Sequence, residues 1–172
     1  MAVALIGLPG CGKSTLGKLL ARRLGTTFVD VDAAVEKRRR LTVAQIFAAD
    51  GEAVFRQMEQ DEFARIAESP EGVVATGGGL VLRAQSRALL IERYTVIYLR
   101  AMVPCLFERT RNNARRPLLQ VADRRAKLEE LFEQRDPLYR ETAHLTVDVI
   151  EARPDAALER MLVLLGRPPM NP

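Results

Sequence analysis

The chain has 172 residues, of which 48% are hydrophobic and 28% charged, and its formal net charge at pH 7 is +4. This length and hydrophobic content suit one core, so we expect a single domain over residues 1–172. No apolar run reaches the roughly 18 residues of a membrane span, no leader precedes the loop that starts at residue 7, and the two cysteines lack metal-site spacing. These features argue against membrane and disulfide-rich secreted proteins and favour the cytoplasm. We expect a monomer, because no apolar heptad or sheet-edge pattern stands out.

The first predicted strand, residues 2–6, leads directly into a glycine-rich loop. Residues 7–15 read Gly-Leu-Pro-Gly-Cys-Gly-Lys-Ser-Thr, the spacing G-x-x-x-x-G-K-[ST], and leucines at helical spacing predict a helix over 13–24. Glycines let successive backbone N–H groups turn inward, and the positive end of the helix completes a cradle for phosphate oxygens. The loop therefore predicts a nucleoside triphosphate site, in which Lys13 would reach the β- and γ-phosphates and the Ser14 hydroxyl would ligate Mg²⁺. The predicted nucleotide-binding residues of this loop are Gly10, Cys11, Gly12, Lys13, Ser14 and Thr15.

Two carboxylates, Asp30 and Asp32, follow the second predicted strand, residues 27–29. In an α/β sheet, ligands bind at the carboxyl ends of the strands, so both side chains should meet the phosphates. Asp30 is the candidate second acid near Mg²⁺, and Asp32 would accept the hydrogen bond of an acceptor hydroxyl and take its proton. The alternative is that Asp32 caps a helix beginning near Ala33.

The rest of the chain alternates apolar runs with helical patterns. Strands are predicted over 72–75, 95–99 and 145–149, and helices over 54–67, 84–92, 103–110, 126–132 and about 157–165. This order is typical of an α/β fold with a parallel sheet. Three glycines, Gly77, Gly78 and Gly79, follow the third strand, where they either let a backbone N–H approach a ligand hydroxyl or form an ordinary tight turn. Residues 112–123 have no clean period and predict a mobile loop.

Six segments of this chain occur in the order and near the spacing found in the shikimate kinase family. They are the loop at 7–15, Phe28-x-Asp30-x-Asp32, Ile46-Phe47 with Gly51-Glu52-x-x-Phe55-Arg56-x-x-Glu59, Thr76-Gly77-Gly78-Gly79, Arg116-Pro117-Leu118-Leu119 and Arg135-x-Pro137-Leu138-Tyr139. The chain resembles that family over roughly residues 2–155. The resemblance implies a P-loop small-molecule kinase fold like that of nucleoside monophosphate kinases. It would have three α/β/α layers, a five-stranded parallel sheet, a small helical substrate-binding excursion at about 32–60 and a lid at about 111–123.

The resemblance also implies an activity, the transfer of the ATP γ-phosphate to the 3-hydroxyl of shikimate on the way to chorismate and the aromatic amino acids. Arg56 and Arg135 match the positions that bind the substrate carboxylate, and Glu59 would orient Arg56. Arg116 in the lid would stabilise the transferring phosphate, which makes it the third catalytic residue beside Lys13 and Asp32.

The adenine contacts that the resemblance implies fall on two other arginines. Arg109 matches a position that stacks on adenine. The family often has an arginine after the last strand, but Ala152 stands in that register, and Arg153 is the candidate substitute one position later.

Two other functions stay open. A kinase for another polyol acid such as gluconate would look similar through the first strand and loop, although the Arg56 and Arg135 pair favours shikimate. A nucleic-acid-associated ATPase would suit the net positive charge, but no catalytic acid directly ends another predicted strand. We expect the basic run at 37–40 to be a solvated helix end rather than a nucleic-acid contact. The expected partners are therefore shikimate and ATP, with no nucleic acid and no membrane.

Overall fold

The computed structural model describes residues 1–111, 116–149 and 154–167. Its centre is a parallel sheet of five strands in the order β2-β3-β1-β4-β5. The strands are β1 (Ala2–Ile6), β2 (Phe28–Asp30), β3 (Gly72–Ala75), β4 (Thr95–Arg100) and β5 (Leu145–Asp148). The sheet confirms the predicted α/β fold, with β2 beginning and ending one residue later than expected.

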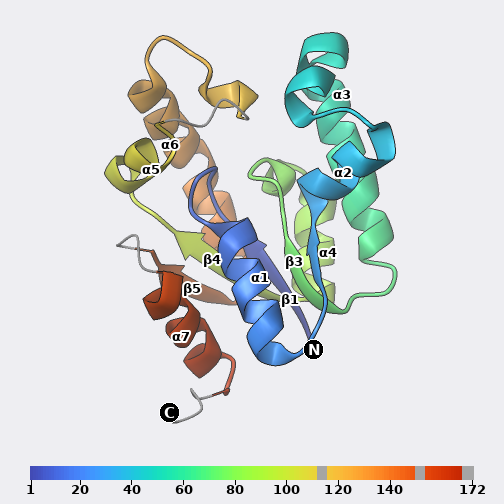
Figure 1. The fold of residues 1–172 in the computed structure, drawn as a ribbon, viewed down its shortest axis with the longest axis vertical. Helices are drawn as coiled ribbons and strands as arrows, with labels where there is room; N and C mark the ends of the chain where they lie inside the picture. The colour runs from blue at the N-terminus through green and yellow to red at the C-terminus, as the bar shows by residue number, and fades with distance from the viewer. Residues whose placement is uncertain (112–115, 150–153, 168–172) are drawn as a thin grey trace.

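Helices cover both faces of the sheet. They are α1 (Lys13–Leu24), α2 (Val31–Arg39), α3 (Val43–Ile66), α4 (Ala84–Arg93), α5 (Val103–Arg109), α6 (Arg124–Thr142) and α7 (Pro154–Leu164), with short 3₁₀ turns η1 (Leu80–Leu82) and η2 (Pro117–Leu119). Helices α1 and α7 pack side by side on one face, and α4 and α6 pack on the other (Figure 1). None of the helices in the described part of the chain combines the length and apolarity that a membrane span requires.

The central strands are apolar on both faces because helices cover both. Residues 3–6 of β1, 73–75 of β3 and 96–99 of β4 are buried almost completely, which explains why these segments lack the alternation of a half-exposed strand. Each crossover brings the chain back to the same edge of the sheet, so the carboxyl ends of β1, β2 and β3 lie together. That edge carries the glycine-rich loop, Asp30 and the Gly77–Gly79 segment.

Two helices are much longer than the sequence pattern predicts. Helix α3 begins at Val43, not near residue 54, because Thr42 and Gln45 form a reciprocal capping box at its start. Gly51 then interrupts the helical dihedrals, with φ 84° and ψ 169°, which hides the helix from periodicity. Helix α6 continues to Thr142 through Pro137, a residue that usually ends or kinks a helix.

Helices α2 and α3 form a small core of their own beside the main one. Val35, Ile46 and Phe55 are buried there, and four further apolar side chains pack around them. The basic run at 37–40 ends α2 and is exposed, as expected. Arg38 pairs with Glu62 at 2.7 Å, and Arg39 pairs with Asp50 at 2.9 Å, so the run holds α2 against α3.

Candidate active site

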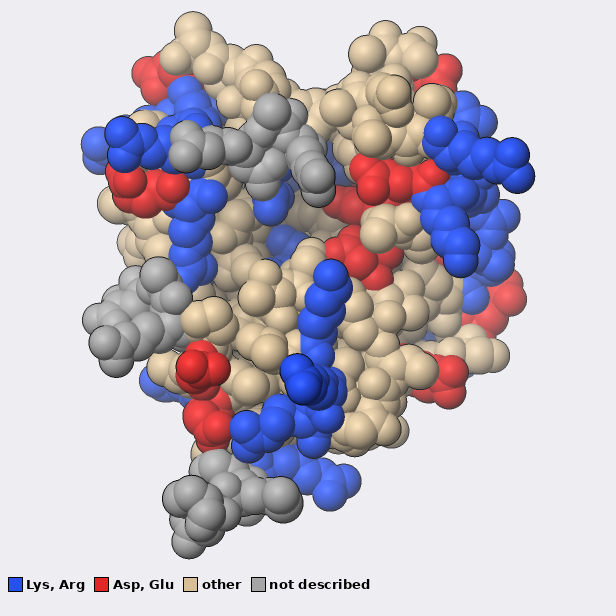
Figure 2. Space-filling view, viewed as in Figure 1, with Lys and Arg blue, Asp and Glu red and all other residues tan. Residues whose placement is uncertain are grey.

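A cleft of about 590 Å³ opens at the carboxyl edge of the sheet, between α2 and α3 on one side and α5 and α6 on the other (Figure 2). The predicted site residues that line it come from segments far apart in the sequence. They are residues 10–15 of the loop, Asp30, Asp32, Arg56, Gly78, Gly79, Arg109, Arg116 and Arg135. Gly77 does not line the cleft, and Arg153 lies outside the described residues.

The glycine-rich loop has the backbone geometry that a phosphate cradle needs. Gly10 and Gly12 have φ values of 90° and 100°, in the region that favours glycine, and α1 begins directly after Gly12. The Lys13 ammonium donates to the carbonyls of Gly7 at 2.7 Å and Leu8 at 3.0 Å, which holds the lysine against its own loop. Its amino group therefore lies inside the cradle, where phosphate charge would be placed.

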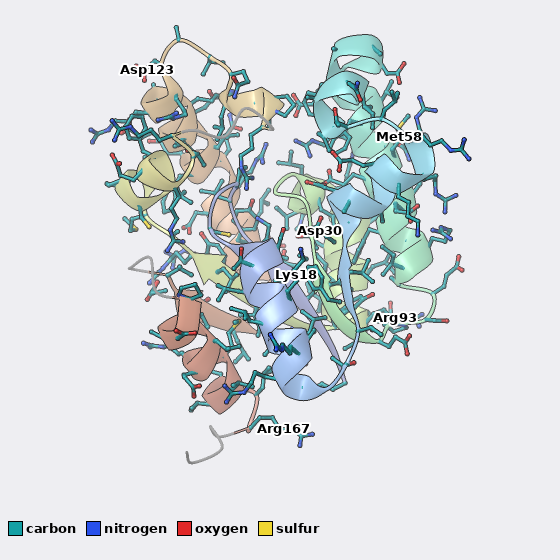
Figure 3. The ribbon with its side chains drawn as sticks, in the orientation of Figure 1. Lys18, Asp30, Met58, Arg93, Asp123 and Arg167 are labelled. Carbon is teal, nitrogen blue, oxygen red and sulfur yellow. The ribbon has the colours of Figure 1, made fainter. Side chains whose placement is uncertain are left out.

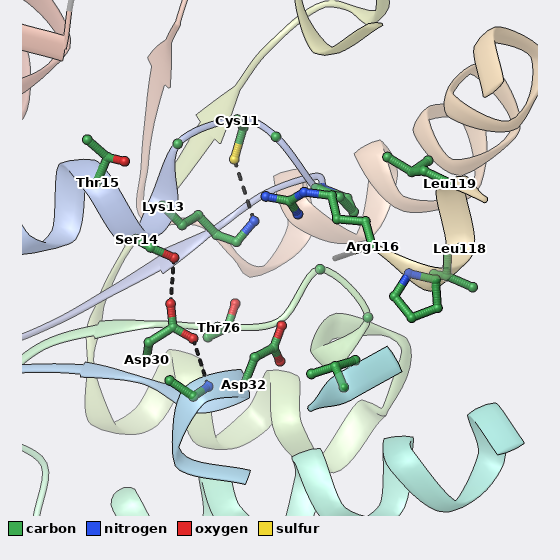
Figure 4. Close-up of a pocket in the computed structure, with 18 of the residues that line it drawn as sticks. Cys11, Lys13, Ser14, Thr15, Asp30, Asp32, Thr76, Arg116, Leu118 and Leu119 are labelled. Carbon is green, nitrogen blue, oxygen red and sulfur yellow. Dashed lines mark hydrogen bonds between the residues drawn. The ribbon is translucent and has the colours of Figure 1, made fainter. Parts of the chain in front are cut away.

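Ser14 and Asp30 meet at the mouth of the loop. Asp30 is the last residue of β2 (Figure 3). The Ser14 hydroxyl donates to Oδ2 of Asp30 at 2.5 Å, and Oδ1 of Asp30 accepts from the backbone N–H of Ala33 at 3.3 Å (Figure 4). Asp30 is therefore the N-cap of α2, which begins at Val31, and the alternative in which Asp32 is the cap is wrong. A hydroxyl and a carboxylate are hard oxygen donors of the kind that Mg²⁺ prefers, so this pair fits the predicted metal.

The carboxylates of Asp32 and Glu59 lie close together, and both border Gly77. Oδ1 of Asp32 and Oε1 of Glu59 are buried, and neither has a hydrogen-bond partner among the described residues. Burial, together with the charges of Glu59 and Asp30, raises the pKa of Asp32 to about 7, although Lys13 and Arg56 oppose the shift. Burial also raises the pKa of Glu59. The sequence pointed to Glu59 only as a partner of Arg56, since its contact with Asp32 spans distant segments.

The Arg56 guanidinium lies between two carboxylates of its own helix. Its Nη1 donates to Glu59 at 2.8 Å, and its Nη2 donates to Glu52 at 3.2 Å. The same group stacks over the ring of Phe55, 5.3 Å from its centroid, and fills the space next to Gly79 that a side chain there would need. The predicted pairing with Glu59 is thus present, and the orientation of Arg56 is fixed from several sides.

Arg135 is a buried cation with unpaired hydrogen-bond donors. It is 3% exposed, and its Nε and Nη1 have no hydrogen-bond partner among the described residues. A buried guanidinium with unpaired donors is costly unless an anion meets it. Arg135 lines the same cleft as Arg56, and two guanidinium groups in one cleft suit an anion such as a carboxylate.

The three glycines leave space that neighbouring protein side chains occupy. The sequence pattern had predicted instead that their backbone approaches a ligand hydroxyl or forms a tight turn. A side chain on Gly77 would strike the carboxylates of Glu59 and Asp32, and one on Gly79 would strike Arg56. Gly78 lies between Pro9 of the glycine-rich loop and Arg135. The backbone also forms a turn, since Leu80 N–H donates to Gly77 O at 3.2 Å.

Arg109 and Arg116 approach the glycine-rich loop from the side of α5. Arg109 Nη1 donates to the Cys11 carbonyl at 3.4 Å. Arg116 precedes η2, and Figure 4 shows its side chain directed toward the loop and Lys13. Its buried Nε has no partner among the described residues, so it is available to a ligand. Of the predicted lid at 111–123, residues 112–115 lie outside the described residues.

An apolar wall, which no sequence pattern predicted, completes the cleft. It consists of Val43, Phe47, Phe55, Leu118 and Leu119. Phe47, Phe55, Leu118 and Leu119 belong to the family-like segments of the sequence, so their motifs could have indicated a role in the site. Val43 lies outside those segments, and no sequence pattern indicated it. Apolar walls with a few fixed charges are typical of sites for small organic ligands.

Comparisons with known proteins agree with this geometry. The model of the family described as shikimate kinase matches residues 9–165. A shikimate kinase from Chromobacterium violaceum is 45% identical over 168 residues, which cover 98% of this chain and 91% of that protein. One from Paracidovorax citrulli is 43% identical, covering 100% of this chain and 97% of that protein. The structure of a shikimate kinase from Acinetobacter baumannii in complex with shikimate has a TM-score of 0.91 at 37% identity, covering 95% of this chain and 92% of that one.

Proposed function

This chain belongs to the shikimate kinase family, whose members are ATP-dependent phosphotransferases, and from that premise we propose how its cleft phosphorylates the 3-hydroxyl of shikimate. One observation carries the proposal. A single cleft joins a phosphate cradle to two guanidinium groups, Arg56 and Arg135, and Asp32 lies near enough to Lys13 and Arg56 for both charges to act on it. A triphosphate and a small acidic alcohol therefore fit the same cleft. The product would be shikimate 3-phosphate, a precursor of chorismate and the aromatic amino acids.

The nucleotide half of the site rests on the loop at 10–15. Its backbone N–H groups and Lys13 bind the β- and γ-phosphates, and Arg116 meets the γ-phosphoryl group as negative charge moves during transfer. Ser14 and Asp30 would hold Mg²⁺, which would neutralise part of the phosphate charge. Arg109 lies beside the loop and contacts the nucleotide near adenine, a role that Arg153 shares in this proposal.

The acceptor half holds shikimate by its carboxylate. Arg56 and Arg135 donate to that carboxylate and fix the ring, while the apolar wall packs against the ring carbons. Asp32 accepts the hydrogen bond of the 3-hydroxyl. As the hydroxyl oxygen bonds to the γ-phosphorus and the bond to the ADP oxygen breaks, the hydroxyl proton passes to Asp32.

Two segments that flank the cleft have roles in this proposal. The excursion at 32–60 binds the acceptor, and the segment at 111–123 covers the nucleotide so that water is kept from the phosphate. We also propose that one chain is sufficient for activity, because the described residues of a single chain supply both halves of the cleft. Both cysteines are free, which suits the reducing cytoplasm.

A coupled assay of ADP release tests the proposal. Shikimate, gluconate, quinate and nucleoside monophosphates are offered as separate acceptors to the magnesium-replete protein. We expect shikimate alone to give rapid ADP release. Faster release with gluconate would support the other polyol-acid kinase instead. Stimulation by nucleic acid that collapses with added salt would support the ATPase.

A further inference from the structure

The carbonyl groups of the Gly77–Gly79 segment are held in two different ways. Those of Gly77 and Gly79 accept from the amides of Leu80 and Leu82, at 3.2 Å and 3.0 Å, within the same turn. The carbonyl of Gly78 instead accepts from the Tyr139 hydroxyl at 2.6 Å, across 61 positions of sequence. This contact ties the middle of the glycine segment to helix α6.

Tyr139 is itself fixed within the core. It is fully buried, and its ring stacks on that of Tyr98 of β4 with 5.0 Å between centroids. The Tyr98 hydroxyl donates to Asp136 at 2.8 Å, and Asp136 accepts from Arg140 at 2.6 Å. The Tyr139 hydroxyl therefore has a defined position, which a surface tyrosine would lack.

The same contact sets the relation between Gly78 and Arg135. Arg135 precedes Tyr139 by four residues, so both side chains leave α6 on one face. Nη1 of Arg135 lies 3.4 Å from the position that a Cβ on Gly78 would take, and Pro9 of the glycine-rich loop lies 3.0 Å from the same position. Phosphate loop, glycine segment and carboxylate-binding helix thus meet at Gly78.

We propose that Tyr139 is a positioning residue for the acceptor: its hydroxyl holds the glycine segment in register with Arg135, so that the site for a carboxylated ring alcohol is formed before the ligand arrives. This inference rests on the proposed function, because it assigns a role in binding shikimate. Without the hydroxyl, the Gly78 carbonyl loses its partner in α6, and the segment gains freedom that ligand binding must remove. The hydrogen bond of the Tyr139 hydroxyl goes to the glycine segment and not to the loop at 7–15, so ATP binding should change much less than shikimate binding.

The test is Tyr139→Phe, which keeps the buried ring and its stacking and removes only the hydroxyl. Its matched control is Tyr98→Phe, which removes the other hydroxyl of the stacked pair, one that contacts Asp136 and not the glycine segment. Shikimate and ATP dissociation constants are measured by calorimetry for both variants and the wild type. KM and kcat are measured alongside, and thermal unfolding sets a temperature at which all three proteins are folded.

We expect Tyr139→Phe to weaken shikimate binding and raise its KM by about three- to tenfold, the equivalent of one net hydrogen bond. ATP binding should stay within about twofold of the wild type. Tyr98→Phe should lower the unfolding temperature and leave both affinities unchanged. In the amide exchange of residues 77–79, only Tyr139→Phe should speed exchange, a readout that holds even where the affinity change is small.

Three outcomes would overturn the inference. If Tyr139→Phe matches the wild type in shikimate affinity and in amide exchange of residues 77–79, the hydroxyl does not position the segment. Equal loss of shikimate and ATP affinity, or equal effects of the two tyrosine variants, would show a general loosening of the fold. Failure of the wild type to bind shikimate would overturn the proposed function as well, whereas the first two outcomes leave it standing.

Discussion

The Glu59 carboxylate occupies the space that a side chain on Gly77 would need, and Asp32 borders the same space. Gly77 is not among the glycines with positive φ, so an alanine there would not strain the backbone. The glycine is required by its neighbours rather than by its own conformation. The acceptor half of the cleft is thus packed tightly around its acids, and small changes of volume or charge there should have measurable effects.

Gly77→Ala should therefore disturb the site by crowding. We expect it to destabilise the fold by about 1–3 kcal/mol, as overpacked cores do, and to weaken shikimate binding because Glu59 and Asp32 must move. Urea unfolding and calorimetry measure the two effects. Gly25→Ala is the control, since Gly25 has a φ of 63° and open space around it, so it should lose stability and keep its affinity. Unchanged shikimate affinity in Gly77→Ala would contradict the packing argument.

Asp32→Asn should abolish phosphoryl transfer and yet stabilise the protein. The pKa of Asp32 is raised to about 7, above its unfolded value of 3.8, so the folded state binds the proton more tightly. The stability that this proton brings is present at low pH and is lost as the pH rises toward 7. In EDTA without nucleotide, the variant should gain on the order of 1 kcal/mol over the wild type above pH 7, and the gain should vanish near pH 4.

Asp148→Asn is the control with the opposite sign. Hydrogen bonds from Arg100, at 2.5 Å and 2.9 Å, lower the pKa of Asp148. The stability that this pair brings is therefore present at neutral pH and is lost as the pH falls through the lowered pKa. Asp148→Asn should be less stable than the wild type at pH 7, with a difference that shrinks in acid. Parallel pH profiles for the two variants would refute the assignment of these shifts.

Asp30→Asn should separate the capping role of Asp30 from its charge. Asparagine caps helices about as well as aspartate, so α2 should remain intact, while the apparent affinity for Mg²⁺ in the ATP reaction should fall by about tenfold or more. Asp123→Asn is the matched control, because Asp123 caps α6 through Ala126 and lies far from Asp30 (Figure 3). Titration of turnover with Mg²⁺ measures the effect. Equal Mg²⁺ requirements in the two variants would exclude Asp30 from the metal site.

Arg135→Lys should weaken the binding of shikimate and keep a positive charge beside Glu59. A lysine cannot form the two parallel bonds of a guanidinium, so KM for shikimate should rise by about ten- to a hundredfold, with KM for ATP little changed. Arg140→Lys, five residues further along α6, keeps a cation beside Asp136 and should match the wild type, because Arg140 does not line the cleft. Steady-state kinetics with shikimate and ATP varied in turn measures both KM values for each variant. An unchanged KM for shikimate in Arg135→Lys would contradict the role of Arg135.

The sequence predicted those parts of the site that local patterns encode. The glycine-rich loop lies between a buried strand and an amphipathic helix, and Asp30 and Asp32 follow an apolar run, so their place at the carboxyl edge could be predicted. The first half of α3 was missed because Gly51 breaks its period, and the end of α6 was missed because Pro137 is normally a helix breaker. Local patterns say nothing of contacts between distant segments, such as those of Glu59 with Asp32 or Tyr139 with Gly78.

Transfer of the γ-phosphate to shikimate can be followed directly by ³¹P NMR with the purified protein, ATP, Mg²⁺ and shikimate. We expect a phosphomonoester coupled to the proton on carbon 3 of shikimate, formed in amounts equal to ADP, and no such product with Asp32→Asn. Release of inorganic phosphate in its place, or no consumption of ATP by folded and magnesium-replete protein, would contradict the proposed transfer.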